Sequence, residues 1–199
     1  IDFARGAKIS GSGFPVYTGR GAEIEWALLN LMLNIHKKNG FEMRLVPHVV
    51  NKQTMYASGQ LPKFATQAFR VHDKDFDHYL IPTAEVALNG LYQDEILDES
   101  ELPKKLVSVS PCFRREAGAH GKNERGLIRV HQFNKVELFA FTKPEDSDDM
   151  FEKFLNSAEE VLQTLGLHYR NMLLVTGDMS FGASKTVDIE VFLPGQNRY

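Results

Sequence analysis

Two kinds of pattern in the sequence agree with an α+β fold, in which helices flank an antiparallel β-sheet. Residues 107–113 and 136–141 are rich in β-forming side chains, and the small, polar segment 117–126 between them is typical of a long hairpin loop. Residues 21–38 and 143–166 instead repeat apolar side chains every three or four positions, which predicts amphipathic helices. The sequence therefore predicts an antiparallel hairpin and helices to cover it.

The predicted hairpin carries a charged face with one aromatic ring. Strand alternation places two arginines, two carboxylates and a phenylalanine on this face: Arg114, Glu116, Arg129, Phe133 and Glu137. Arginine binds phosphate oxygens bidentately, phenylalanine offers a stacking plane, and a carboxylate accepts hydrogen bonds from an amine or an ammonium. Such a face suits a nucleoside triphosphate beside an amino acid. The same alternation also allows a salt-bridged hairpin that simply faces solvent.

A specific motif runs along this hairpin. Phe113-Arg-x-Glu116, followed after a loop by Gly126-Leu-Ile-Arg-x-His-Gln-Phe-x-Lys-Val-Glu137, resembles motif 2 of the class II aminoacyl-tRNA synthetases, in the form found in seryl-tRNA synthetases. The resemblance implies an antiparallel sheet flanked by helices. It also implies ATP-dependent activation of L-serine to seryl-adenylate, and transfer of the seryl group to tRNA.

The resemblance covers nearly all of residues 1–199, which are then expected to be one incomplete catalytic domain. The N-terminal tRNA-binding arm and the C-terminal motif 3 of that family are absent from the sequence. We therefore expect this segment alone to be inactive or weakly active. Two alternatives are a related enzyme that charges a carrier protein and a non-catalytic interaction protein. A coiled-coil arm ahead of the chain would indicate tRNA, and a degenerate motif 3 would indicate the interaction protein.

The resemblance also implies roles for individual residues. Catalysis is expected from Arg114, on the α-phosphate and the serine carboxylate, and from Glu116, at the adenine amine. The implied ATP-binding residues are Arg114, Arg115, Glu116, Arg129, Val130 and Phe133. The implied serine-binding residues are Thr83, Ala84, Glu85, Arg114 and Glu137. Alternation points the Arg115 side chain to the opposite face, so we expect no catalytic effect from it. The implied cofactors are ATP and Mg²⁺, and no metal-ligating residue is predicted.

Thr83 has a second interpretation that needs no ligand. It follows Pro82 and precedes a short run that can be helical, so its hydroxyl fits the N-cap of a helix. The two interpretations are compatible, because the start of a helix can also face a ligand.

Residues 21–47 predict a long helix, then a strand that Pro47 ends. The predicted apolar stripe of the helix is Ile24, Ala27, Leu28, Leu31, Met32 and Ile35. The segment resembles motif 1 of the class II synthetases, which implies a homodimer interface. The alternative is a core helix and strand without a partner.

Other segments carry weaker signals. Residues 50–69 predict a loop that resembles a segment found near the active site of seryl-tRNA synthetases, and residues 94–105 predict a charged, solvated connector. Further on, 169–175 and 186–192 predict strands. Asp188 and Glu190 share a face of the last strand and could bind a hard cation, although such pairs are more often salt-bridged.

Composition limits the class of protein. The 199 residues are 43% hydrophobic and 25% charged, which is typical of a single globular domain, and the net charge of −3 argues against a free-standing nucleic-acid binder. The single cysteine, Cys112, excludes an intrachain disulfide and is expected to be a buried structural thiol. This cysteine usage suits the cytoplasm, and no apolar run is long enough for a membrane span.

Overall fold

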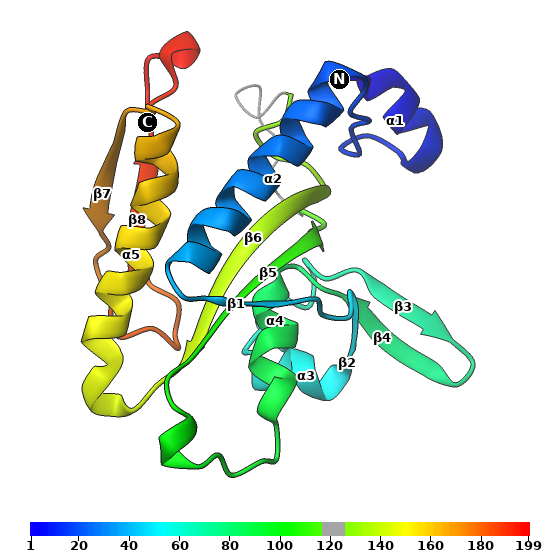
Figure 1. Ribbon diagram of the computed structural model, residues 1–199. Coiled ribbons are helices and arrows are strands. Elements are labelled where there is room, and N and C mark those ends of the chain that lie inside the picture. The colour runs from blue at the N-terminus through cyan, green and yellow to red at the C-terminus, as the bar shows by residue number, and fades with distance from the viewer. Residues whose placement is uncertain (117–125) are drawn as a thin grey trace. The chain divides into compact units, whose positions relative to one another are not determined.

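The computed structural model describes residues 1–116 and 126–199 (Figure 1). The predicted hairpin loop at 117–126 therefore lies almost entirely outside the described residues. Contacts within the chain group into two compact units, Ile1–Asp146 and Ser147–Tyr199. Both helices and strands are present, and most strand pairs are antiparallel, so the predicted α+β fold is confirmed.

The centre of the first unit is the predicted hairpin. β5 (Lys104–Phe113) pairs antiparallel with β6 (Gln132–Phe141), and β1 (Glu42–Arg44) adds to β5 in parallel (Figure 1). β5 begins three residues before the predicted position, and β6 begins four residues before it. Because Leu106 and its neighbour Val107 are both buried, both faces of β5 are covered.

In the register of the hairpin, long side chains on β6 lie opposite small side chains on β5. Phe133, Lys135 and Glu137 on β6 lie opposite three small residues of β5: Cys112, Ser110 and Ser108. Residues paired across an antiparallel ladder point to the same side of the sheet. All three small residues are fully buried, and burial raises the pKa of the Cys112 thiol, as expected for a structural cysteine.

A second sheet has the order β2-β4-β3 and is antiparallel throughout: β2 (Val49–Asn51), β4 (Phe76–Leu80) and β3 (Arg70–Asp73). Between β2 and β3, the helix α3 (Lys52–Ala57) occupies part of the segment for which the sequence predicted only a loop. Its N-cap is Asn51, whose side chain accepts a hydrogen bond from the Thr54 amide at 2.8 Å.

The hydrophobic core of the first unit surrounds α4 (Ala84–Asn89). Val86 and Leu88 are fully buried against Met55, Ile81 and the β5 residue Leu106. Phe139 and Phe141 of β6 pack on the same cluster. This packing holds the first turn of α4 against the hairpin.

The predicted long helix is α2 (Arg20–Lys38), and a shorter helix, α1 (Phe3–Ser10), precedes it. The predicted apolar stripe is buried only in part. The C-terminal half of α2 buries Leu29, Ile35 and His36, whereas Ile24 is 68% exposed. The chain therefore covers this stripe near Ile35 but not at Ile24, because periodicity identifies an apolar face but does not say what covers it.

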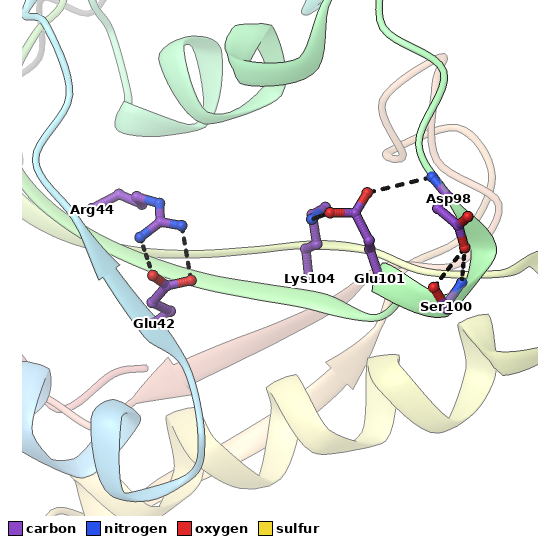
Figure 2. Close-up of polar contacts among 6 residues, drawn as sticks. All are labelled: Glu42, Arg44, Asp98, Ser100, Glu101 and Lys104. Atoms are coloured by element: carbon purple, nitrogen blue, oxygen red, sulfur yellow. Dashed lines mark hydrogen bonds and ion pairs between the residues drawn. The ribbon is translucent and has the colours of Figure 1, made fainter.

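The charged connector before β5 is exposed but held by polar contacts, which Figure 2 shows. Asp98 and Glu101 form a capping box around a short 3₁₀ turn, Glu99–Glu101, and the Asp98 carboxylate accepts a hydrogen bond from the Ser100 amide at 2.8 Å. Glu101 also pairs with Lys104 at 3.2 Å, where β5 begins. On the neighbouring strand β1, Arg44 binds Glu42 in a bidentate pair.

The second unit contains one helix and one hairpin. Its helix α5 (Ser147–Thr164) is preceded by the 3₁₀ turn Pro144–Asp146, and β7 (Tyr169–Leu173) pairs antiparallel with β8 (Val187–Val191). The Arg170 guanidinium donates to the Glu190 carboxylate at 2.7 Å, so one of the two carboxylates on β8 is salt-bridged. A last 3₁₀ turn spans Pro194–Gln196. Among the described residues, no helix is long and apolar enough to cross a membrane.

Candidate active site

A cavity of about 400 Å³ opens in the first unit, beside the ends of β5 and β6. Three separate stretches of the chain meet there: the segment around α3, the start of α4, and the two hairpin ends. Five of the predicted site residues line the cavity: Thr83, Glu85, Arg114, Glu116 and Arg129. The cavity is therefore where the residues implied by the motif come together.

Thr83 links the start of α4 to the hairpin. Its side-chain oxygen accepts a hydrogen bond from the Glu85 amide at 3.2 Å, which confirms the N-cap interpretation. The same hydroxyl donates to Glu137 of β6, and the Lys135 ammonium pairs with the same Glu137 oxygen. Thr83 is only 3% exposed, so its hydroxyl is held in one orientation at the wall of the cavity.

Unlike the Glu137 carboxylate, the Glu85 carboxylate has no hydrogen-bond donor or ion-pair partner among the described residues. Glu85 is exposed and lines the cavity, yet the surrounding protein displaces part of its solvent, and this desolvation raises the pKa of the Glu85 carboxyl above its usual value. The negative charge of Glu137 raises that pKa further, while Lys135 and Arg114 oppose the shift. Within the described part of the chain, no donor is bonded to the Glu85 carboxylate. A bound cation would fill that place.

Arg114 is anchored just beyond the end of β5. Its Nε donates to the Pro82 carbonyl at 3.2 Å, and its guanidinium lies 5.2 Å from the centre of the Phe133 ring. The Arg114 carbonyl lies 3.0 Å from Nδ1 of His131, and the Arg114 amide donates to the His131 carbonyl at 2.9 Å. These contacts present the guanidinium to the cavity.

Glu116 and Arg129 form an ion pair beside the hairpin end, where β5 ends and β6 begins. Arg129 donates to Glu116 at 2.9 Å, and both lie outside the strands, because β5 ends at Phe113 and β6 begins at Gln132. Glu116 has a positive φ of 47°, which a regular strand does not allow. The predicted strand alternation was therefore wrong at these two positions, although the two side chains do meet.

The other predicted residues, which include Phe133 and Glu137 of β6, are not among the residues that line this cavity. Ala84 is fully buried in the first turn of α4, and Val130 is 7% exposed next to Arg129. The Arg115 side chain lines a second cavity, of about 540 Å³, together with Arg70 and Tyr79. This places the Arg115 side chain away from Arg114, as the alternation predicted.

Sequence reasoning missed several residues of the cavity. Lys135 lies on its wall and alternates with Phe133 and Glu137 on β6, so the even spacing could have found it. The segment around α3 adds Met55, Gln60 and Phe64. Only the resemblance had placed this segment near an active site, since its own residues predicted a loop.

Comparison with known proteins agrees with this geometry. The serine–tRNA ligase of Chlamydia caviae is 55% identical over all 199 residues, which cover 47% of its length. The crystal structure of seryl-tRNA synthetase from Pyrococcus horikoshii complexed with ATP has a TM-score of 0.93 and 41% identity, over 99% of this chain and 44% of that one. A cytoplasmic serine–tRNA ligase from Naegleria fowleri in complex with AMP has a TM-score of 0.92 and 34% identity, over 98% and 45% of the two chains.

The chain spans about half the length of the relatives that it matches. The resemblance drawn from motif 2 is confirmed by these matches, which extend over the whole chain. In addition, residues 69–199 match the family model described as the tRNA synthetase class II core domain (G, H, P, S and T). The cavity at the hairpin end, with its arginines and carboxylates, thus lies in a chain that belongs to the class II core-domain family of tRNA synthetases.

Proposed function

We propose that this chain carries the serine-activating site of a serine–tRNA ligase. The reaction is the ATP-dependent conversion of L-serine to seryl-adenylate, followed by transfer of the seryl group to tRNA. The observation that carries the proposal is that Arg114 and Arg129 line the same cavity as the carboxylates of Glu85 and Glu116. The names of the relatives support serine and tRNA, and the ATP and AMP of the two similar structures support the nucleotide.

Activation needs positioning and charge stabilisation more than covalent help. A carboxylate oxygen of serine attacks the α-phosphorus of ATP, and the bond to the β-phosphate oxygen breaks to release pyrophosphate. Arg114 holds the serine carboxylate and the α-phosphate together and stabilises the charge that develops on phosphorus. Its anchoring by the Pro82 carbonyl and by the Phe133 ring supports this role. In the second step a ribose hydroxyl of tRNA attacks the carbonyl, and AMP leaves.

The nucleotide occupies the hairpin end. Glu116 accepts from the adenine amine, Phe133 stacks on the ring, and the Val130 backbone contacts the base. Arg129 binds the distal phosphates, for which it exchanges its present contact with Glu116. Arg115 contributes to this segment through its backbone, whose amide donates to the Gln67 carbonyl at 2.9 Å. The other end of the cavity receives serine, at Thr83, Ala84, Glu85 and Glu137.

Mg²⁺ belongs to the same proposal as a companion of ATP. In residues 1–116 and 126–199, no group of three His, Cys, Asp or Glu side chains could hold a metal ion. Phosphate oxygens are suitable ligands for Mg²⁺, so the ion would enter with the nucleotide. It would neutralise phosphate charge there. A cytoplasmic location stays a prediction from the cysteine content.

The proposal is tested by serine-dependent exchange of radioactive pyrophosphate into ATP. We expect exchange in the full-length protein and little or none in residues 1–199 alone, because the chain spans about half the length of its relatives. Charging of tRNA with serine, in the same preparation, separates a tRNA ligase from an enzyme that charges a carrier protein. A folded full-length protein without exchange would favour the interaction protein.

Dimerisation through residues 21–47 is a further part of the proposal. In this region Ile24, Trp26 and Leu45 are 68%, 67% and 78% exposed, and the strand residue Met43 is 37% exposed. Large apolar side chains that are exposed in a single chain can be covered by a partner chain. A second copy of the chain is the occupant that the motif 1 resemblance implies.

We expect Trp26→Asp in the full-length protein to convert the dimer to a monomer, because a buried, unpaired carboxylate at an interface is costly. Light scattering after gel filtration measures the mass. Ile96→Asp is the matched control, since Ile96 is fully exposed outside this region. A Trp26→Asp protein that keeps a dimer mass equal to that of the control would exclude this surface.

A further inference from the structure

Lys135 occupies a position in the cavity for which the motif implied no role. It projects from the same face of β6 as Phe133 and Glu137, and its ammonium pairs with a Glu137 oxygen. That oxygen also accepts the Thr83 hydroxyl. Glu137 therefore already accepts from one cationic and one neutral donor. The Lys135 side chain is 30% exposed and the Glu137 side chain is 18% exposed, so both are largely withdrawn from solvent.

The second carboxylate of this end of the cavity, Glu85, is in a different state. It faces charged groups from every neighbouring element: Glu137 and Lys135 of β6, Arg114 and Glu116 after β5, and Arg129 before β6. Within the described residues none of these cations is bonded to it. Glu85 and Lys135 line the cavity, Glu137 lies behind them against Thr83 and Lys135, and the lysine pairs with only one of these two carboxylates.

We propose that Lys135 is a positioning residue that assigns the two carboxylates to different parts of the amino acid. Glu137, held by Lys135 and Thr83, accepts the side-chain hydroxyl, and Glu85 receives the ammonium. This inference rests on the proposed function, because it concerns how that site orients serine.

The assignment follows from charge. An ammonium that approached Glu137 would meet the like charge of Lys135, whereas a hydroxyl would not, and a carboxylate has enough acceptor capacity for a third donor. Glu85, without a neutralising partner, attracts the ammonium. With both ends of the amino acid fixed in this way, its carboxylate points toward Arg114.

Without the positive charge of Lys135, the ammonium of serine would be attracted to Glu137 and to Glu85 with nearly equal strength. Serine would then bind in two orientations, and only one of them brings its carboxylate to the α-phosphate. We expect kcat to fall more than KM rises. We also expect the preference for serine over alanine to fall, because that preference depends on an acceptor reserved for the hydroxyl.

The experiment measures ATP–pyrophosphate exchange in the full-length protein, with serine and with alanine, across pH. Lys135→Met is compared with Lys135→Arg and with the control Lys143→Met, which removes a lysine of similar exposure (32%) from a surface pair with Glu99. For Lys135→Met we expect kcat with serine to fall about tenfold or more, the scale for a lost hydrogen bond to a charged group. The acidic limb of kcat/KM should move to higher pH, since Lys135 normally lowers the pKa of Glu85.

Lys135→Arg should keep most of the activity, and Lys143→Met should match the unmodified protein. If serine activation is intact in the control and Lys135→Met keeps the same kcat, the inference fails while the proposed function stands. A loss of kcat with unchanged serine preference and unchanged pH profile would mean a merely structural role, and would also overturn it. Absence of serine activation in the unmodified protein removes the proposed function and this inference together. If Lys135→Met is unfolded by circular dichroism, Lys135→Gln replaces it.

Discussion

Replacing Arg114 with alanine in the full-length protein should lower serine-dependent ATP–pyrophosphate exchange by at least ~10²-fold, the scale for losing one preorganised charge-stabilising donor. Two observations support so large an effect. The guanidinium is fixed by the Pro82 carbonyl and lies over the Phe133 ring. The free energy needed to reorient this group during the reaction is therefore small. The variant also removes a positive charge that lowers the pKa of Glu85.

The measurement is steady-state exchange with serine and ATP varied in turn, so that kcat and KM are separated. Arg70→Ala is the matched control, because Arg70 forms an ion pair with Asp77 on the β3–β4 hairpin and does not line the first cavity. Near-normal kcat in Arg114→Ala would remove this residue from the reaction.

Glu85→Gln should raise the KM for serine by about 30-fold or more, since removing a charge partner of a bound ammonium typically costs at least ~2 kcal/mol. The unmodified protein should also lose serine affinity as the pH falls through the raised pKa of Glu85, because the protonated carboxyl no longer attracts the ammonium. Glu85→Gln should remove this acidic limb. The control is Glu99→Gln, which neutralises a carboxylate in a surface pair with Lys143.

The sign of the pH effect separates binding from unfolding. A pKa that is raised in the folded state means that the folded chain holds the proton more tightly than the unfolded chain does. Through Glu85, acid therefore stabilises the fold while it weakens serine binding. Serine KM and thermal unfolding, measured on the same samples from pH 8 to about pH 4, the ordinary range of a glutamate carboxyl, should reveal this divergence. An acidic limb that persists in Glu85→Gln would assign the titration to another group.

The sequence predicted those parts of the fold that local pattern controls. The hairpin, α2, α5 and the Thr83 cap follow from periodicity and cap preferences, and the site residues Arg114, Glu116 and Arg129 follow from the motif. Assembly was harder to predict. The Thr83–Glu137 hydrogen bond joins residues 54 positions apart, and no local pattern encodes such a contact. Likewise, the residue type does not predict the positive φ at Glu116. At that residue the backbone leaves the strand conformation, so strand alternation no longer predicts the direction of the side chain.

The small residues on β5 have a consequence for the cavity that no ligand contact reveals. Ser108, Ser110 and Cys112 lie across the ladder from Glu137, Lys135 and Phe133, and all three are fully buried. Their small volumes set the space that is left for the three longer side chains opposite them, one of which, Lys135, lines the cavity. A methyl group added to this buried row would have no solvent to enter, so it would displace the acceptor, the cation or the ring opposite it. In the proposed site, residues that the substrate does not touch would thus help to set the size of the amino acid that fits.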